Sequence, residues 1–223
     1  MKISEIHFYH GWGFNADFWK DWVRMASFSR YHIYDRGYTG NPHGSQDFND
    51  DSELRIVVSH SFGLHFIPED AIRQASLVVI IGGFEQFHPE NDRISKKKLA
   101  RMINRFSEMP LTVMTDFYTN CMYPEKRIMD SPDKLKLDLL GDDLRFLNQS
   151  RLSTLDALRE RRVLLFHGMD DIIVPSIRSL ALHTSLPGSR LIEIARAGHM
   201  IPLTHRDLIY RNLTGIIESG NSV

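Results

Sequence analysis

Cysteine is nearly absent from the 223-residue sequence, since Cys121 is the only one. A disulfide within the chain is therefore impossible, and a zinc site built on cysteine pairs is excluded as well. Long apolar runs are also missing, and no stretch approaches the roughly 20 residues that a membrane span needs. The amino-terminal residues show no small-residue cleavage pattern. These absences favour a protein of the reducing cytoplasm with no membrane partner.

The sequence also has almost no excess of charge, because 27 Lys and Arg residues face 28 Asp and Glu residues, a formal net charge of −1. A near-neutral chain gives no global attraction to nucleic acid, so a charged partner must bind a local patch. Hydrophobic residues make up 42% and charged residues 25%, as in globular proteins with a real core. We expect one domain, or a domain with an insertion, and we favour a monomer.

Short β-branched or aromatic runs recur along the chain and alternate with helix-like segments. The runs are too continuous for strands with one wet face, and instead indicate parallel strands buried on both sides. They cover residues 3–9, 31–34, 54–58, 77–81, 163–166 and 191–194, and the helical segments cover 17–28, 62–74, 175–186 and 205–217. The alternation predicts the α/β class, with a mostly parallel sheet flanked by helices.

One stretch breaks the alternation. Residues 84–161 contain no convincing strand, but they contain several helical patterns separated by prolines. We interpret this stretch as a helical insertion, a lid, in a core made of residues 1–83 and 162–223.

The strand predicted at 54–58 leads into the sequence SHSFG at residues 59–63. A strand, a sharp turn and a helix form the context of a nucleophile elbow, in which small outer residues let the central serine protrude at the edge of the sheet. Ser61 is therefore the candidate nucleophile. The usual pattern is Gly-x-Ser-x-Gly, and Ser59 replaces the first glycine, so the motif alone is also compatible with an ordinary turn.

A serine nucleophile needs a base and an orienting acid, which follow it in the order acid, histidine in this topology. An acid lies in HGMDDIIVP at 167–175, directly after a predicted strand, and Asp171 fits the expected spacing better than Asp170, which we interpret as a turn residue. His199 in AGHM at 197–200 follows the last predicted strand. We predict that Asp171 orients His199, and that His199 is the base for Ser61.

Acyl transfer at a serine also needs two backbone donors for the oxyanion. The residue after the nucleophile, Phe62, supplies one N–H. The second is expected in HGWG at 10–13, which follows the first predicted strand and whose glycines allow close backbone approach, and Trp12 is the candidate. A plain Gly-rich turn would also account for this segment.

Taken together and in order, these four motifs resemble the α/β-hydrolase superfamily across nearly the whole chain. The sequence DRGYTG at 35–40 adds a fifth match, being similar to the Asp-x-x-Gly-x-Gly loop of that fold. The strand at 3–9 already leads to the oxyanion loop, so the antiparallel strands that often open the fold look missing. The segment from Asp35 to Ser61 leaves little room for a helix, and Pro68 limits the helix after the elbow.

The opening HGWGFNA at 10–16, followed by Phe18 and Trp19, resembles the pimeloyl-acyl-carrier-protein methyl ester esterases of biotin synthesis. That resemblance implies hydrolysis of a methyl ester at the far end of a pimeloyl chain carried on acyl carrier protein, with no cofactor and no metal. It also implies that Phe117 in the lid contacts the acyl chain.

Positive charge gathers in the lid, where residues 93–105 include six basic side chains and no acidic one. Four of them are spaced by four and share one side of a helix: Arg93, Lys97, Arg101 and Arg105. We name these four the basic face and predict that it binds the acidic carrier protein, although a merely solvated face is an equal alternative.

Two other functions stay open. A general short-chain carboxylesterase or thioesterase would use the same triad on free small molecules. A non-catalytic binding protein could keep the fold and use its pocket for recognition alone.

Overall fold

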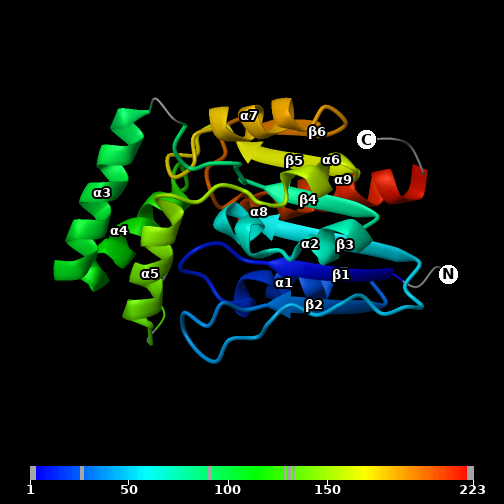
Figure 1. The fold of residues 1–223 in the computed structure, drawn as a ribbon, viewed down its shortest axis with the longest axis horizontal. Helices are drawn as coiled ribbons and strands as arrows, with labels where there is room; N and C mark the ends of the chain where they lie inside the picture. The colour runs from blue at the N-terminus through cyan, green and yellow to red at the C-terminus, as the bar shows by residue number, and fades with distance from the viewer. Residues whose placement is uncertain are drawn as a thin grey trace.

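A single parallel sheet forms the centre of the molecule. The computed structural model describes residues 4–25, 28–89, 92–127, 129, 132 and 134–219. Within them six strands pair in the order β2-β1-β3-β4-β5-β6, all in parallel (Figure 1). They are β1 (Ser4–Tyr9), β2 (Arg30–Tyr34), β3 (Leu54–His60), β4 (Leu77–Ile81), β5 (Val163–Gly168) and β6 (Arg190–Ile194). Each predicted run is confirmed as a strand, and the ends differ by at most two residues.

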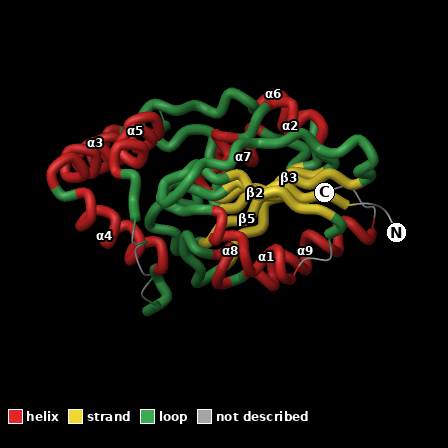
Figure 2. Tube along the Cα trace, turned by 90° about the horizontal axis from the view of Figure 1, so that it is seen from below, coloured by secondary structure: helices red, strands yellow, loops and turns green. Residues whose placement is uncertain are grey.

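Helices cover both faces of the sheet, as Figure 2 shows. One layer holds α2 (Glu69–Gln74), α6 (Leu155–Arg159) and α7 (Ile177–Ser185), and the other holds α1 (Lys20–Met25), α8 (Ile201–Thr204) and α9 (Arg206–Ser219). All five residues of β4 are at most 2% exposed, because β4 lies in the middle of the sheet between these layers. Burial of each such side chain stabilises the fold by about 1.5 to 3 kcal/mol.

The helix expected over 62–74 is two shorter elements. A 3-10 helix, η2 (Ser61–Phe66), is followed by extended backbone at Ile67 and Pro68, and α2 begins only after them. Proline has no N–H and disfavours helical geometry in the residue before it, so the helix breaks there. The segment expected at 17–28 likewise divides into η1 (Ala16–Trp19) and α1.

The stretch 84–161 carries three longer helices to one side of the sheet, α3 (Arg93–Glu108), α4 (Pro110–Met122) and α5 (Leu137–Leu147) (Figure 1). In its described residues the only β pairing is an isolated bridge between Gln86 and Arg151. The short α6 packs instead against α2, where Ala157 and Leu158 join the core on that face. We keep the word lid for α3 to α5.

No helix in the described part of the chain combines the length and the apolar character that crossing a membrane requires.

Candidate active site

The three side chains predicted to form the triad all follow strands at one edge of the sheet. Ser61 comes directly after β3, Asp171 follows β5, and His199 follows β6. Because the strands are parallel, their carboxyl ends lie at the same edge, which faces the lid in Figure 1. The sheet topology therefore explains why residues so far apart in the sequence meet.

Ser61 lies at a sharp turn with φ +53°, a backbone conformation that non-glycine residues rarely adopt. The turn depends on Gly63, since a Cβ atom there would lie 2.5 Å from the carbonyl oxygen of His10. Ser59, which stands where the usual motif has glycine, is fully buried in β3. The structure thus has the geometry of a nucleophile elbow, with a serine accommodated at its first small position.

Asp171 and His199 contact each other directly. Nδ1 of His199 lies 2.7 Å from Oδ2 of Asp171, and the side chains are each 1% exposed. The other carboxylate oxygen accepts hydrogen bonds from the amides of Ile173 and Val174, both at 2.8 Å. Since a carboxylate can only accept, Nδ1 of His199 carries the proton and Nε2 is left with a lone pair for a nucleophile's proton. Asp171, rather than its neighbour Asp170, makes this contact.

His60 connects the elbow to the base. Its ring lies 4.6 Å from the ring of His199, and its Nε2 donates to the backbone oxygen of His199 at 3.1 Å. Burial lowers the pKa of His60 well below its ordinary value, so the ring is neutral. The residue that precedes Ser61 therefore contacts both the ring and the backbone of His199.

A second buried histidine supports the acid. Nε2 of His167 donates to the carbonyl of Val174 at 2.8 Å, and the amide of that same Val174 donates to Asp171. The other ring nitrogen lies 2.6 Å from Oγ of Ser179. Burial lowers the pKa of His167, although the nearby Asp171 acts in the opposite direction. His167 fixes the loop that carries the acid.

The two predicted oxyanion donors belong to segments that flank the elbow. Phe62 lies in the first turn of η2, where backbone N–H groups have no partner within the helix. The loop with Trp12 passes beside the nucleophile, since a Cβ atom at Gly11 would lie 3.1 Å from the Cβ atom of Ser61. The indole Nε1 of Trp12 donates to the carbonyl of Leu140 in α5 at 2.9 Å. The lid therefore holds the side chain of an oxyanion-loop residue.

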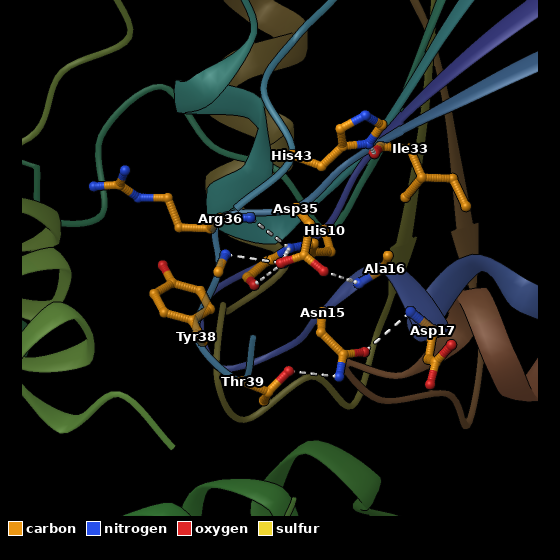
Figure 3. Close-up of polar contacts among 12 residues, drawn as sticks. His10, Asn15, Ala16, Asp17, Ile33, Asp35, Arg36, Tyr38, Thr39 and His43 are labelled. Atoms are coloured by element: carbon orange, nitrogen blue, oxygen red, sulfur yellow. Dashed lines mark hydrogen bonds and ion pairs between the residues drawn. The ribbon is translucent and has the colours of Figure 1, made fainter. Parts of the chain in front are cut away.

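The loop at 35–40, the fifth motif, braces the oxyanion loop (Figure 3). Oδ2 of Asp35 accepts from the amide of Ala16 at 2.8 Å, and Oδ1 accepts from the amide of Gly37 at 2.8 Å. Asn15 donates to the hydroxyl of Thr39 at 2.9 Å. These bonds extend the contact between the two segments beyond the pairing of β1 with β2, which ends at Tyr9 and Tyr34.

A mostly apolar cavity of about 400 Å³ opens onto Ser61. Its lining includes Trp12, Phe62 and Phe117, and also Asp92 and Arg178, which form an ion pair at 2.6 Å. Its remaining lining comes from the lid and the strand ends and includes Phe84, Phe87, Leu99, Met102, Leu144, Leu147, Ile172 and Ile173. The aromatic rings of Trp12 and Phe117 meet edge to face at 4.8 Å. Such a cavity suits an aliphatic chain.

The four residues of the basic face are all exposed on α3. Two of them, Arg101 and Arg105, line a second cavity of about 430 Å³. This cavity shares four lining residues with the first: Met102, Phe117, Asn120 and Ile173. Arg105 is paired with Asp116 at 2.6 Å. The carboxyl-terminal part of the basic face therefore borders the space that leads to Ser61.

The lid also contacts the loop of the base. A Cβ atom at Gly198, the residue before His199, would overlap the backbone oxygen of Tyr123 at 1.6 Å. Only glycine permits this approach, so the end of α4 rests directly on the histidine loop.

No group of three or more His, Cys, Asp or Glu side chains that could hold a metal ion gathers in the described part of the chain.

Comparisons with known proteins bear on the fold. No protein-family model and no curated protein matches the sequence. Solved structures do match. An esterase from Exiguobacterium antarcticum superposes with TM-score 0.77 at 15% identity, over 97% of this chain and 92% of that one. A bromoperoxidase from Bacillus anthracis gives TM-score 0.76 at 17% identity, over 96% and 92%. A hydrolase from Oleispira antarctica gives 0.74 at 16% identity, over 96% and 91%.

The chain has the α/β-hydrolase fold. Within that fold, the predicted triad and oxyanion residues follow the strands that the motifs indicated, and Phe117 and the basic face lie on the lid helices α4 and α3. Sequence reasoning missed His60 and His167, because a buried histidine has no distinguishing sequence pattern. Their position in the sequence was the one available signal, since His60 directly precedes Ser61 and His167 opens the motif that contains Asp171.

Proposed function

We propose that the protein is a serine esterase in which Ser61, His199 and Asp171 form the catalytic triad. The observation that carries the proposal is the buried hydrogen bond between Asp171 and His199 at the same edge of the sheet as Ser61, a serine that has positive φ and lines an apolar cavity. The fold and this arrangement support acyl transfer more than simple binding, which would need neither the strained serine nor the oriented imidazole.

The proton on Nδ1 of His199 leaves Nε2 to act as the base, which defines the proposed reaction. Nε2 of His199 takes the proton of Ser61 as Oγ attacks the ester carbonyl, and Asp171 stabilises the charged imidazole. The amides of Trp12 and Phe62 donate to the oxyanion of the tetrahedral intermediate. His199 then returns the proton to the leaving alcohol. Water then attacks the acyl-enzyme while His199 takes its proton, and His199 passes that proton to Oγ of Ser61 as the acid leaves.

Reaction with a fluorophosphonate probe tests this proposal and separates it from a non-catalytic binding role. The expected result is one adduct, at Ser61, together with loss of ester hydrolysis in Ser61→Ala. An unlabelled wild-type protein, or substantial turnover by Ser61→Ala, would show that the nucleophile is assigned wrongly.

The substrate we propose is the methyl ester of pimeloyl-acyl carrier protein, with methanol as the leaving alcohol. Two observations support it: the apolar cavity at Ser61 fits an aliphatic chain, and the exposed basic face borders the adjoining cavity at Arg101 and Arg105. A carrier protein is acidic, so such a face would attract it through long-range charge interactions that salt screens.

Charge reversal tests the carrier as partner. Replacing Arg93, Lys97 and Arg101 by glutamate should raise KM for the carrier-bound ester several-fold at low salt and less at high salt. A p-nitrophenyl ester should be hydrolysed as before, because it makes no contact with the face. Equal losses on both substrates would contradict a carrier site. Complementation of a biotin auxotroph lacking its own methyl ester esterase then tests the pathway.

A general short-chain carboxylesterase is the second candidate. It is favoured by the names of structures that share the fold, which include esterases and a carboxylesterase, although their identity to this chain is low. Normal expression without complementation, combined with hydrolysis of small esters, would select this candidate.

A further inference from the structure

The peptide between Gly11 and Trp12 is oriented by a side chain outside the triad. Nδ1 of His10, which is 1% exposed, lies 2.9 Å from the carbonyl oxygen of Gly11. The amide of Phe14 also donates to this oxygen, at 3.4 Å. In a trans peptide the C=O and the following N–H point in opposite directions. Holding the oxygen of Gly11 toward His10 therefore directs the N–H of Trp12 the other way.

The contacts of His10 fix its tautomer. A carbonyl oxygen can only accept, so Nδ1 must carry the proton. The backbone N–H of Arg36 donates to Nε2 at 3.1 Å, which requires a lone pair there. His10 is thus held from both sides, between the oxyanion loop and the 35–40 loop, and its Nε2 also lies 3.5 Å from Oδ1 of Asp35 (Figure 3).

Arg36 is in turn held by the lid. Its guanidinium makes two parallel hydrogen bonds to Asp143 of α5, at 2.7 and 2.8 Å, and the hydroxyl of Tyr38 donates to the same carboxylate at 2.7 Å. Asp143 is only 3% exposed, and a buried carboxylate with this many donors is strongly fixed. The guanidinium also lies 5.1 Å from the centre of the Phe66 ring at the end of η2.

We propose that Asp143 is a positioning residue for the oxyanion hole, acting from the lid through Arg36 and His10 on the Gly11–Trp12 peptide. The lid would then position both the backbone and the side chain of Trp12, because the indole of Trp12 donates a hydrogen bond to α5. The inference rests on the proposed esterase function for its kinetic consequence, but the contacts themselves do not depend on it.

The test compares Asp143→Asn with Asp142→Asn. The neighbouring Asp142 is exposed, and its ion pair is with Arg145 of the same helix, so its variant should behave as wild type. On p-nitrophenyl acetate, which is too small to need the lid for binding, Asp143→Asn should lower kcat about tenfold and change KM less than twofold. A trifluoromethyl ketone, which forms a tetrahedral oxyanion with the serine, should bind about tenfold more weakly. A fall in kcat with no change in ketone affinity would overturn the proposal.

A double-mutant cycle tests the route. His10→Asn places an amide donor where Nδ1 was and removes the acceptor for Arg36. In that background Asp143→Asn should cost less than twofold, because the connection is already cut. An undiminished tenfold loss would show that Asp143 acts by another route.

Hydrogen exchange provides a readout that needs no activity. The amide of Phe14 should exchange faster in Asp143→Asn than in Asp142→Asn, because its acceptor, the oxygen of Gly11, is no longer held. Equal exchange in two folded variants would overturn the proposal even if the protein proves not to be an esterase. Should Asp143→Asn fail to fold, Arg36→Lys, which keeps the charge but not the paired hydrogen bonds, replaces it in each measurement.

Discussion

The loops at the strand ends and the helices of the lid differ in which side chains they bury and which they expose. In the loops, Asp171 and His199 are almost fully buried, and their polar atoms are paired with nearby amides and carboxylate. The lid exposes large apolar side chains, Ile94 at 70% and Leu111 at 63%, and the loop after β5 exposes Met169 and Ile172, each at 53%. We propose that the buried pair determines the chemistry and that the lid surface selects what reaches it.

The largest expected effect comes from breaking the buried pair. His199→Ala and Asp171→Asn should each lower kcat by about 10⁴-fold, because the first removes the base and the second disturbs its tautomer. The lid variant Leu111→Ser should leave turnover within twofold. Ester hydrolysis measured on purified, folded variants checks this contrast, and a comparable loss in Leu111→Ser would erase the distinction between the two regions.

Replacing one glycine of the loops should have the next largest effect. Gly63→Ala should destabilise the protein by about 3 kcal/mol or more, since the new Cβ atom would overlap backbone that cannot move aside. In the matched control Gly215→Ala, on α9, nothing lies within 4 Å, and alanine should stabilise the helix by about 0.5 to 1 kcal/mol. Denaturant unfolding monitored by circular dichroism measures both. Equal changes would contradict the close packing of the elbow.

Much of the core could be predicted, because buried parallel strands have continuous apolar sequences and their loops carry short motifs. The link from Arg36 to Asp143 could not, because these residues are 107 positions apart and no motif pairs them. The break at Ile67 and Pro68 agrees with the limit that Pro68 was expected to set on the helix after the elbow. The packing of α6 against α2 could not be predicted either, because the periodicity of apolar residues indicates which face of a helix is buried but not which element covers it.

A smaller effect concerns the chain that the cavity accepts. Phe117→Ala should lower kcat/KM for an octanoyl ester about tenfold, since it removes an aromatic wall of the cavity, and should change hydrolysis of an acetyl ester less than threefold. Met109→Ala, at a lid residue 50% exposed and outside the cavity lining, is the control. A proportional loss on both esters would place Phe117 with the catalytic loops rather than with the selective lid.

The smallest effect concerns one partly buried histidine of η2. Burial lowers the pKa of His65 to about 4, from an ordinary value of 6.5, while its hydrogen bond to Phe84 opposes the shift. The unfolded chain therefore binds the extra proton first, and stability present above pH 6.5 is lost as the pH falls toward 4. Between pH 7.5 and 6 the loss is on the order of 1 kcal/mol. Urea unfolding should show a shallower pH dependence in His65→Gln, and an unchanged slope would refute this assignment.

The contact between Gly198 and the end of α4 has a consequence for engineering. A lid transplanted from another protein of this fold would bring its own backbone to the place where Tyr123 now contacts the loop of His199. Unless the transplanted segment matched the surface of the Gly198–His199 loop, it would displace His199 or lose contact with the loop. Lid and base loop must therefore be exchanged together, and randomised libraries should keep position 198 as glycine.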